Sequence, residues 1–188
     1  MEKKKEKETG QDKKKKLMNE LIEDVVLVAV VLVVVFVIKH FVMINAVIPS
    51  ASMENTIMTG DRIFGNRLTY TFGDPERGDI VIFKYPDNEK ELFIKRVIGL
   101  PGEKVEIRDG MVYINDSEEP LEEDYLRETP VGDFGPYYVP EGYYFMLGDN
   151  RNYSKDSRLW EHPYVARDKI LAKAAVRYYP FDSIGMIE

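Results

Sequence analysis

Residues 48–53 read Ile-Pro-Ser-Ala-Ser-Met and stand where an apolar segment gives way to a polar body. They place two hydroxyl side chains, Ser50 and Ser52, two residues apart. A serine hydroxyl is a weak nucleophile that an adjacent base must activate. We interpret Ser52 as a candidate nucleophile, and Ser50 as a hydrogen-bond donor to the oxyanion that would form beside it.

The segment before this stretch is apolar enough to suggest a membrane helix. Residues 25–38 are uninterrupted apolar residues, and residues 17–21 and 41–44 extend the run toward the roughly 20 residues that a span needs. A transmembrane helix, a cleaved signal peptide and a buried core element all fit this pattern. Because no small-x-small cleavage site follows the run, we expect an uncleaved anchor over residues 17–44.

The first 16 residues are rich in lysine. They hold eight lysines and four acidic residues, with almost nothing apolar, which predicts a solvated, disordered tail. Lysines that flank a membrane span tend to remain in the cytoplasm. The pattern therefore predicts a single-pass protein of the cell membrane, with its N-terminus in the cytoplasm and residues 45–188 on the extracytoplasmic face.

Downstream of residue 45, short apolar runs alternate with turn sequences such as Thr-Gly-Asp and Pro-Gly-Glu. This density of short strands without long amphipathic helices predicts a mainly β body built on an antiparallel sheet. Residues 116–134 are acidic and irregular, so we expect an exposed loop or a small β excursion within a cap at residues 108–143. The expected strands cover residues 61–68, 79–84, 92–98, 104–108, 111–114, 137–139, 143–147 and 172–179.

Composition excludes several classes of site. The chain has no cysteine, so disulfides and thiolate chemistry are absent, and its two histidines form no zinc-binding pattern. Residues 45–188 hold 17 basic and 26 acidic residues, a balance that argues against a nucleic-acid partner. We therefore expect no metal, no cofactor and no nucleic acid, while the oligomeric state stays open.

The base for Ser52 has few candidates. A Ser-His-Asp arrangement would need His162, because His40 lies beside the apolar run. The alternative is a lysine kept neutral by apolar surroundings, since burial disfavours the charged form. Lowering the pKa of a lysine from about 10.4 to about 8 costs roughly 3 kcal/mol, which the fold must supply.

Lys95 fits that requirement best among the lysines. It lies within Leu-Phe-Ile-Lys-Arg-Val-Ile at residues 92–98, and on a strand it shares one face with Phe93 and Val97. Lys173, between two alanines, is a weaker candidate. Periodicity alone leaves open that Lys95 is a snorkelling lysine on an edge strand.

Five short sequence boxes follow one another between residues 49 and 158. They are Pro-Ser-Ala-Ser-Met at 49–53, Thr-Gly-Asp-Arg at 59–62, Arg-Gly-Asp-Ile-Val at 77–81, Lys-Arg-Val-Ile-Gly-Leu-Pro-Gly at 95–102, and Gly-Asp-Asn-Arg through Ser-Lys-Asp-Ser-Arg at 148–158. Their order and spacing resemble those of bacterial type I signal peptidases, in the short form typical of Gram-positive members, over about residues 20–181.

This resemblance implies a signal-peptidase-like fold and a Ser–Lys protease that removes signal peptides from secreted preproteins. Ser52 would be the nucleophile and Lys95 the general base, with the Ser52 N–H and the Ser50 hydroxyl as the oxyanion hole. Ser154 would hydrogen-bond the Lys95 amine and orient it. Two ion pairs would support the site, with Asp149 and Asp156 as the acids and Arg96 and Arg158 as the bases.

The resemblance also implies a substrate and a place of action. The family cuts after small-x-small sequences at the outer face of the cytoplasmic membrane, so we expect preprotein signal peptides and the lipid membrane as partners. The substrate would lie extended along a strand edge. The expected substrate-binding residues are Ile48, Pro49, Met53, Phe93 and Ile94.

Two alternatives remain beside this hypothesis. One is a non-catalytic relative that binds extended peptides, for instance in the assembly of surface proteins. Retention of both Ser52 and Lys95 argues against it. The other is a self-cleaving Ser–Lys protease, which the membrane-type segment disfavours.

Overall fold

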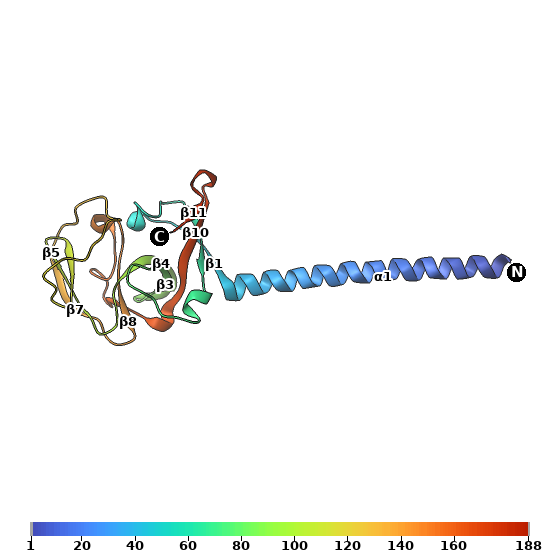
Figure 1. Cartoon of the computed structure of the whole chain (residues 1–188), viewed down its shortest axis with the longest axis horizontal. Coiled ribbons are helices and arrows are strands. Elements are labelled where there is room, and N and C mark those ends of the chain that lie inside the picture. The colour runs from blue at the N-terminus through green and yellow to red at the C-terminus, as the bar shows by residue number, and fades with distance from the viewer. Residues whose placement is uncertain (1, 188) are drawn as a thin grey trace. The chain divides into compact units, whose positions relative to one another are not determined.

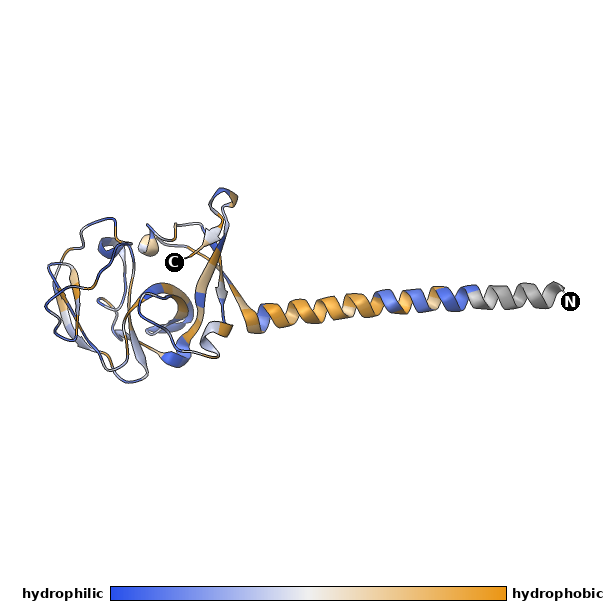
Figure 2. Cartoon of the chain, in the orientation of Figure 1, coloured by the Kyte–Doolittle hydropathy of each residue, from blue (hydrophilic) through white to orange (hydrophobic). Residues whose placement is uncertain are grey.

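The computed structural model describes the backbone of residues 2–187 and the side chains of residues 13–187, and it divides into two units at residues 41 and 42. The first unit is the helix α1, Glu2–Val37. By length and composition, Lys13–Val42 is long and apolar enough to cross a membrane. Figure 2 shows that the last part of α1 before Val37 is apolar on all sides. A helix that is apolar all round suits a lipid surrounding.

The tail differs from the prediction, because α1 already begins at Glu2 and includes the lysine-rich residues expected to be disordered. Lysine and glutamate are good helix formers, and here they continue the helix formed by the apolar run. Lys16 and Glu20 also form an i,i+4 ion pair at 4.0 Å. The expected end of the anchor at residue 44 is likewise corrected, since a π-helical turn at Ile38–Val42 leads directly into the strand β1, Met43–Val47.

The second unit is mainly β, as the sequence predicts, and contains two antiparallel sheets. The larger sheet has the order β1-β2-β10-β3-β4-β8-β9, with β11 paired to β10, and the smaller has the order β6-β5-β7. In Figure 1, β5 and β7 lie at one end of this unit and β1 and β10 at the other. The strands of the larger sheet after β1 are β2 Arg62–Asn66, β3 Ile80–Tyr85, β4 Asn88–Gly99, β8 Tyr143–Leu147, β9 Tyr164–Ala166, β10 Ile170–Tyr179 and β11 Gly185–Met186. Those of the smaller sheet are β5 Lys104–Arg108, β6 Met111–Ile114 and β7 Phe134–Tyr138.

Each expected strand has an observed counterpart, and three short strands were missed. The first, β1, overlaps the expected anchor at Met43 and Ile44, because these two residues continue the apolar run. In the structure β1 pairs with β2, from Met43 opposite Asn66 to Val47 opposite Arg62. The other two, β9 and β11, are three and two residues long and are too short to carry a period.

Strand β3 is buried on both faces and forms the centre of the unit. Val81 and Phe83 point into one apolar cluster with Trp160, whereas Ile80 and Ile82 point into another. A third cluster lies between the two sheets and includes Phe145 of β8. Because β4 contributes to all three clusters, its position along the sheet is strongly specified.

Phe145 provides a test of this packing. Phe145→Ala is expected to lower the free energy of unfolding by about 3–5 kcal/mol, because the ring is 0% exposed and its removal leaves a cavity. The matched control is Phe72→Ala, since Phe72 is 87% exposed and its loss should change stability by less than about 0.5 kcal/mol. Urea unfolding of the detergent-solubilised chain, followed by the fluorescence of its single tryptophan, measures both. Equal losses in the two variants would contradict the assigned core.

Candidate active site

The segment that carries Ser52 is held between β1 and β2. After β1 ends, Ile48 exchanges backbone hydrogen bonds with the turn before β2, donating to Asp61 O at 2.9 Å and accepting from Gly60 N at 2.8 Å. The chain then forms a short 3-10 turn, η2, Ala51–Met53. Met53 is fully buried in the apolar cluster beneath. The burial of Met53 fixes the backbone at Ser52, and the hydroxyl of Ser52 contacts Lys95.

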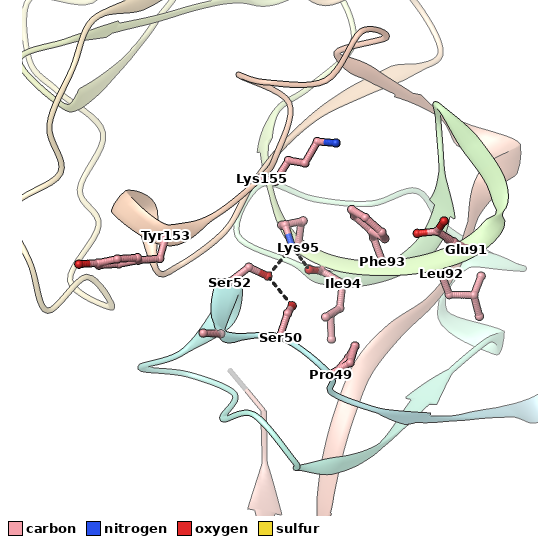
Figure 3. A pocket seen from close by; sticks show the side chains of 11 residues that line it. Pro49, Ser50, Ser52, Glu91, Leu92, Phe93, Ile94, Lys95, Tyr153 and Lys155 are labelled. Carbon is pink, nitrogen blue, oxygen red and sulfur yellow. Dashed lines mark hydrogen bonds between the residues drawn. The ribbon is translucent and has the colours of Figure 1, made fainter.

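Lys95 of β4 lies directly against Ser52. Its Nζ is 2.6 Å from Ser52 Oγ and donates a second hydrogen bond, of 2.9 Å, to Ile94 O (Figure 3). Lys95 is only 3% exposed and lies 5.4 Å from the centre of the Phe93 ring. The amine is therefore enclosed, as the apolar neighbours of Lys95 in the sequence indicate.

Burial lowers the pKa of Lys95 to about 8, while the negative charges of Asp156 and Asp149 act in the opposite direction. A lysine with this pKa is neutral in about one molecule in ten at pH 7, compared with fewer than one in a thousand for an exposed lysine. Neutral Lys95 can accept a proton from the hydroxyl that it contacts. The geometry thus provides a nucleophile with an adjacent base.

Ser50 lies on the open side of this pair. Its hydroxyl oxygen is 3.4 Å from Ser52 Oγ, and its side chain is exposed toward the cavity (Figure 3). A hydroxyl in this place can donate to an oxygen bound near Ser52. The neighbouring groups therefore fit the expected role of Ser50.

Gly148 and Asn150 clamp the backbone of the nucleophile segment. Asn150 N donates to Ser52 O at 3.1 Å, and its side-chain amide donates to Ala51 O at 3.0 Å. A Cβ on Gly148 would lie 2.4 Å from Ser52 O and 2.2 Å from Ser154 Oγ. Glycine is needed here because two backbone segments approach more closely than any side chain permits.

Ser154 is close by but does not make the hydrogen bond expected of it. Its hydroxyl is buried and has no hydrogen-bond partner among residues 13–187. The hydrogen bonds of Lys95 Nζ go to Ser52 and to the carbonyl of Ile94 instead. The structure thus places Ser154 beside Gly148 and Ser52, and corrects the predicted contact with the amine.

Two buried ion pairs support the site. Arg96 binds Asp149 through Nε at 2.9 Å and Nη2 at 2.7 Å, and Thr56 donates to the same carboxylate at 2.5 Å. Arg158 binds Asp156 through Nε at 2.8 Å and Nη2 at 2.9 Å. The Arg96–Asp149 pair joins β4 to the segment after β8. The Arg158–Asp156 pair links two residues of that same segment.

A cavity of about 490 Å³ opens over Ser52 and Lys95. In Figure 3, Ser50 and Pro49 lie on one side of Lys95, and Lys155 lies on the other. Pro49, Phe93 and Ile94, which the sequence predicts to contact substrate, line it. The lining consists of Pro49, Ser50, Ala51, Ser52, Glu91, Leu92, Phe93, Ile94, Lys95, Tyr153 and Lys155.

Ile48 and Met53, which the sequence predicts to bind substrate, lie away from the cavity. Neither lines the cavity, and both pack in the apolar cluster with Ile57 and Ile63. Their side chains are engaged in holding η2 onto the sheet. The cavity lining also includes Leu92, next to the predicted Phe93, and Tyr153 and Lys155, which lie within the fifth sequence box.

The other candidate bases lie elsewhere. His162 is 69% exposed at its side chain and its Nδ1 lies 2.9 Å from Asp87. Lys173 forms an ion pair with Asp79. Sequence reasoning also missed Glu123 and Tyr125, which contact the ion-pair network and carry no signal beyond their place in an acidic stretch.

Comparisons with known proteins identify the family of the chain. Residues 21–179 match the model of the family described as signal peptidase, peptidase S26. The chain is 42% identical over 155 residues to a probable signal peptidase I-2 of Synechocystis sp., covering 80% of this chain and 69% of that protein. It is 40% identical to signal peptidase I of Leptolyngbya laminosa, covering 88% and 83%. It is also 34% identical to signal peptidase I T of Bacillus subtilis, covering 95% and 96%. The chain belongs to the signal peptidase family, peptidase S26.

Proposed function

We propose that this chain is a serine endopeptidase that removes N-terminal signal peptides from secreted preproteins by means of a Ser52–Lys95 dyad. The observation that carries the proposal is the 2.6 Å contact between Ser52 Oγ and the buried amine of Lys95. The relatives named signal peptidase I supply the class of substrate. A merely peptide-binding relative would have no need to enclose a lysine at this energetic cost.

The reaction follows from the two side chains. Neutral Lys95 takes the hydroxyl proton as Ser52 Oγ attacks the scissile carbonyl carbon, and the carbonyl oxygen becomes an oxyanion. The N–H of Ser52 and the hydroxyl of Ser50 donate hydrogen bonds to that oxygen. Lys95 then gives its extra proton to the leaving amine, which is the new N-terminus of the mature protein. A water molecule, deprotonated by Lys95, hydrolyses the remaining ester and releases the signal peptide.

The substrate would lie extended between residues 48–50 and residues 92–94. Strand β4 pairs with β8 only from Arg96 onward, so residues 92–94 have no strand partner on the side away from β3 within the described chain. A free strand edge accepts a peptide through backbone hydrogen bonds. Shallow walls formed by Pro49, Phe93 and Ile94 suit the small side chains of a small-x-small site.

The helix α1 and the relatives fit a membrane-anchored protein. We place the lysine-rich start of α1 in the cytoplasm, following the usual distribution of positive charge. The catalytic unit would then lie on the extracytoplasmic face, with the lipid membrane as a second partner. Signal peptides end at that same surface.

Removal of either member of the dyad is expected to abolish cleavage. Ser52→Ala removes the attacking oxygen and Lys95→Met removes the base, and each should lower kcat by about 10³-fold or more. The measurement is the mass of the new N-terminus released from a preprotein that carries an Ala-x-Ala site, incubated with the detergent-solubilised chain.

Two variants control for the choice of base. Lys173→Met removes a lysine that pairs with Asp79 and does not line the cavity, and His162→Ala removes the exposed histidine. Both are expected to retain activity within about twofold, because neither side chain lines the cavity. Cleavage by Lys95→Met, or its loss in His162→Ala, would exclude the dyad.

The pH dependence of cleavage should report the titration of Lys95. Because the neutral amine is the active form, kcat/KM is expected to rise about tenfold per pH unit below the pKa of about 8 and to level off above it. Initial rates of cleavage, measured from about pH 5.5 to about pH 10, give this pH profile. A plateau that begins near pH 6.5, the ordinary pKa of histidine, would point to another base.

Lys95→Met is also expected to stabilise the fold. The folded-state pKa of Lys95, about 8, lies below the unfolded value of 10.5, so folding is penalised while the amine is protonated in both states. The penalty is complete below pH 8 and disappears as the pH rises through 10.5. At pH 6–7 the variant should gain up to about 3 kcal/mol in free energy of unfolding, with a smaller gain toward pH 10. Urea unfolding tests this, and an equal gain for Lys173→Met would contradict it.

A further inference from the structure

A buried ion pair joins the acidic segment between β6 and β7 to Arg151, which follows β8. Arg151 Nη1 donates to Glu123 Oε2 at 2.9 Å, and Arg151 Nη2 binds Glu123 Oε1. The two side chains are 3% and 2% exposed. An ordinary exposed loop would leave Glu123 in water, where such a pair contributes little. The largely exposed segment is therefore docked at this one point.

Tyr125 extends this contact to the second arginine of the site. Its hydroxyl donates to Glu123 Oε1 at 2.6 Å and accepts from Arg151 Nη2 at 3.3 Å. The guanidinium of Arg96 stacks over its ring, 3.9 Å from the ring centre. Cation–π contacts of this kind are strongest when they are shielded from water. One short stretch thus contacts both Arg96 and Arg151.

Further hydrogen bonds join this segment to the same part of the active site. The side chain of Asn152 accepts from Val131 N at 3.1 Å and donates to Thr129 O at 3.2 Å. Both Arg151 and Asn152 belong to the short helix η4, Arg151–Tyr153, which leads to the cavity-lining residue Tyr153. The acidic segment therefore rests on the loop that clamps Ser52.

The contacts continue from the arginines to the dyad. Arg151 Nε donates to Gly148 O at 3.1 Å, within the turn whose Asn150 N binds Ser52 O. Arg96 directly follows Lys95 on β4 and binds Asp149 in that same turn. Each partner of the dyad is thus one or two contacts away from Glu123 or Tyr125.

We propose that Glu123 and Tyr125 are positioning residues for catalysis: they hold Arg151 and Arg96, and through them the turn at residues 148–150, at the spacing that brings Ser52 onto Lys95. This inference rests on the proposed function of the dyad. Neither residue touches the cavity, so both act on the reacting atoms through the arginines. A displacement of about 1 Å at the nucleophile can lower the rate about 10²-fold.

The test compares Glu123→Gln with Glu122→Gln, which makes the same change at the exposed neighbouring residue. Glu123→Gln should lower kcat about 10- to 100-fold and leave KM within about twofold, because the substrate walls are unaltered while the dyad is displaced. Glu122→Gln should match the wild type in both parameters. A second variant, Tyr125→Phe, removes only the bridging hydroxyl and should lower kcat by a smaller factor with KM unchanged.

Trp160 fluorescence and urea unfolding show that each variant is folded under the assay conditions. An unchanged kcat in folded Glu123→Gln, an equal loss in Glu122→Gln, or a change confined to KM would overturn the proposal. Failure of Glu123→Gln to fold would also overturn it, since the pair would then support the whole unit and not the dyad. Ser52→Ala tests the dyad separately. If Ser52→Ala retains activity, the proposed function is wrong; if Ser52→Ala is inactive and Glu123→Gln is fully active, only the positioning role is wrong.

Discussion

The enclosure of one amine against one hydroxyl is the constraint on which the site depends. Lys95 is useful as a base because it is deprived of water, and the lowered pKa corresponds to about 3 kcal/mol of folding free energy. A net stability of about 5–15 kcal/mol is typical of a domain, so this penalty is a substantial fraction of it. The residue must therefore sit where the surrounding packing is strongest. Strand β4, which contributes to three apolar clusters, provides such a place.

The charges around Lys95 have to be arranged so that they do not cancel the effect of burial. Asp149 and Asp156 both favour the protonated amine. Each is bound to an arginine, Arg96 and Arg158 respectively, at hydrogen-bond distance. Opposite charge beside each carboxylate reduces its field at the lysine. The two ion pairs thus join the segments of the site while allowing Lys95 to lose its proton near neutral pH.

Much of this arrangement could be read from the sequence. Short apolar runs separated by turn sequences predicted the β body, and the expected strands overlap observed ones because their turns are strongly marked. Periodicity could not choose Lys95, since a strand lysine between Ile94 and Arg96 fits an edge as well as a core. The buried position of Glu123 had no local signal either. Its environment is created by Arg151, 28 residues away, and long-range pairing leaves no pattern in the neighbouring sequence.

The two members of the dyad are held by different kinds of structure. Lys95 belongs to a central strand with partners on both sides of its sheet from Arg96 onward, whereas Ser52 lies on a three-residue turn. The turn is fixed by Met53 beneath it and by the hydrogen bonds of Asn150 above. Two hydrogen bonds from Asn150, and not a ladder of strand pairs, hold the backbone of this turn from above. A shift of the turn at residues 148–150 would therefore separate Ser52 from Lys95 while the strands keep their pairing, so catalytic competence depends on a more local set of contacts than the fold does.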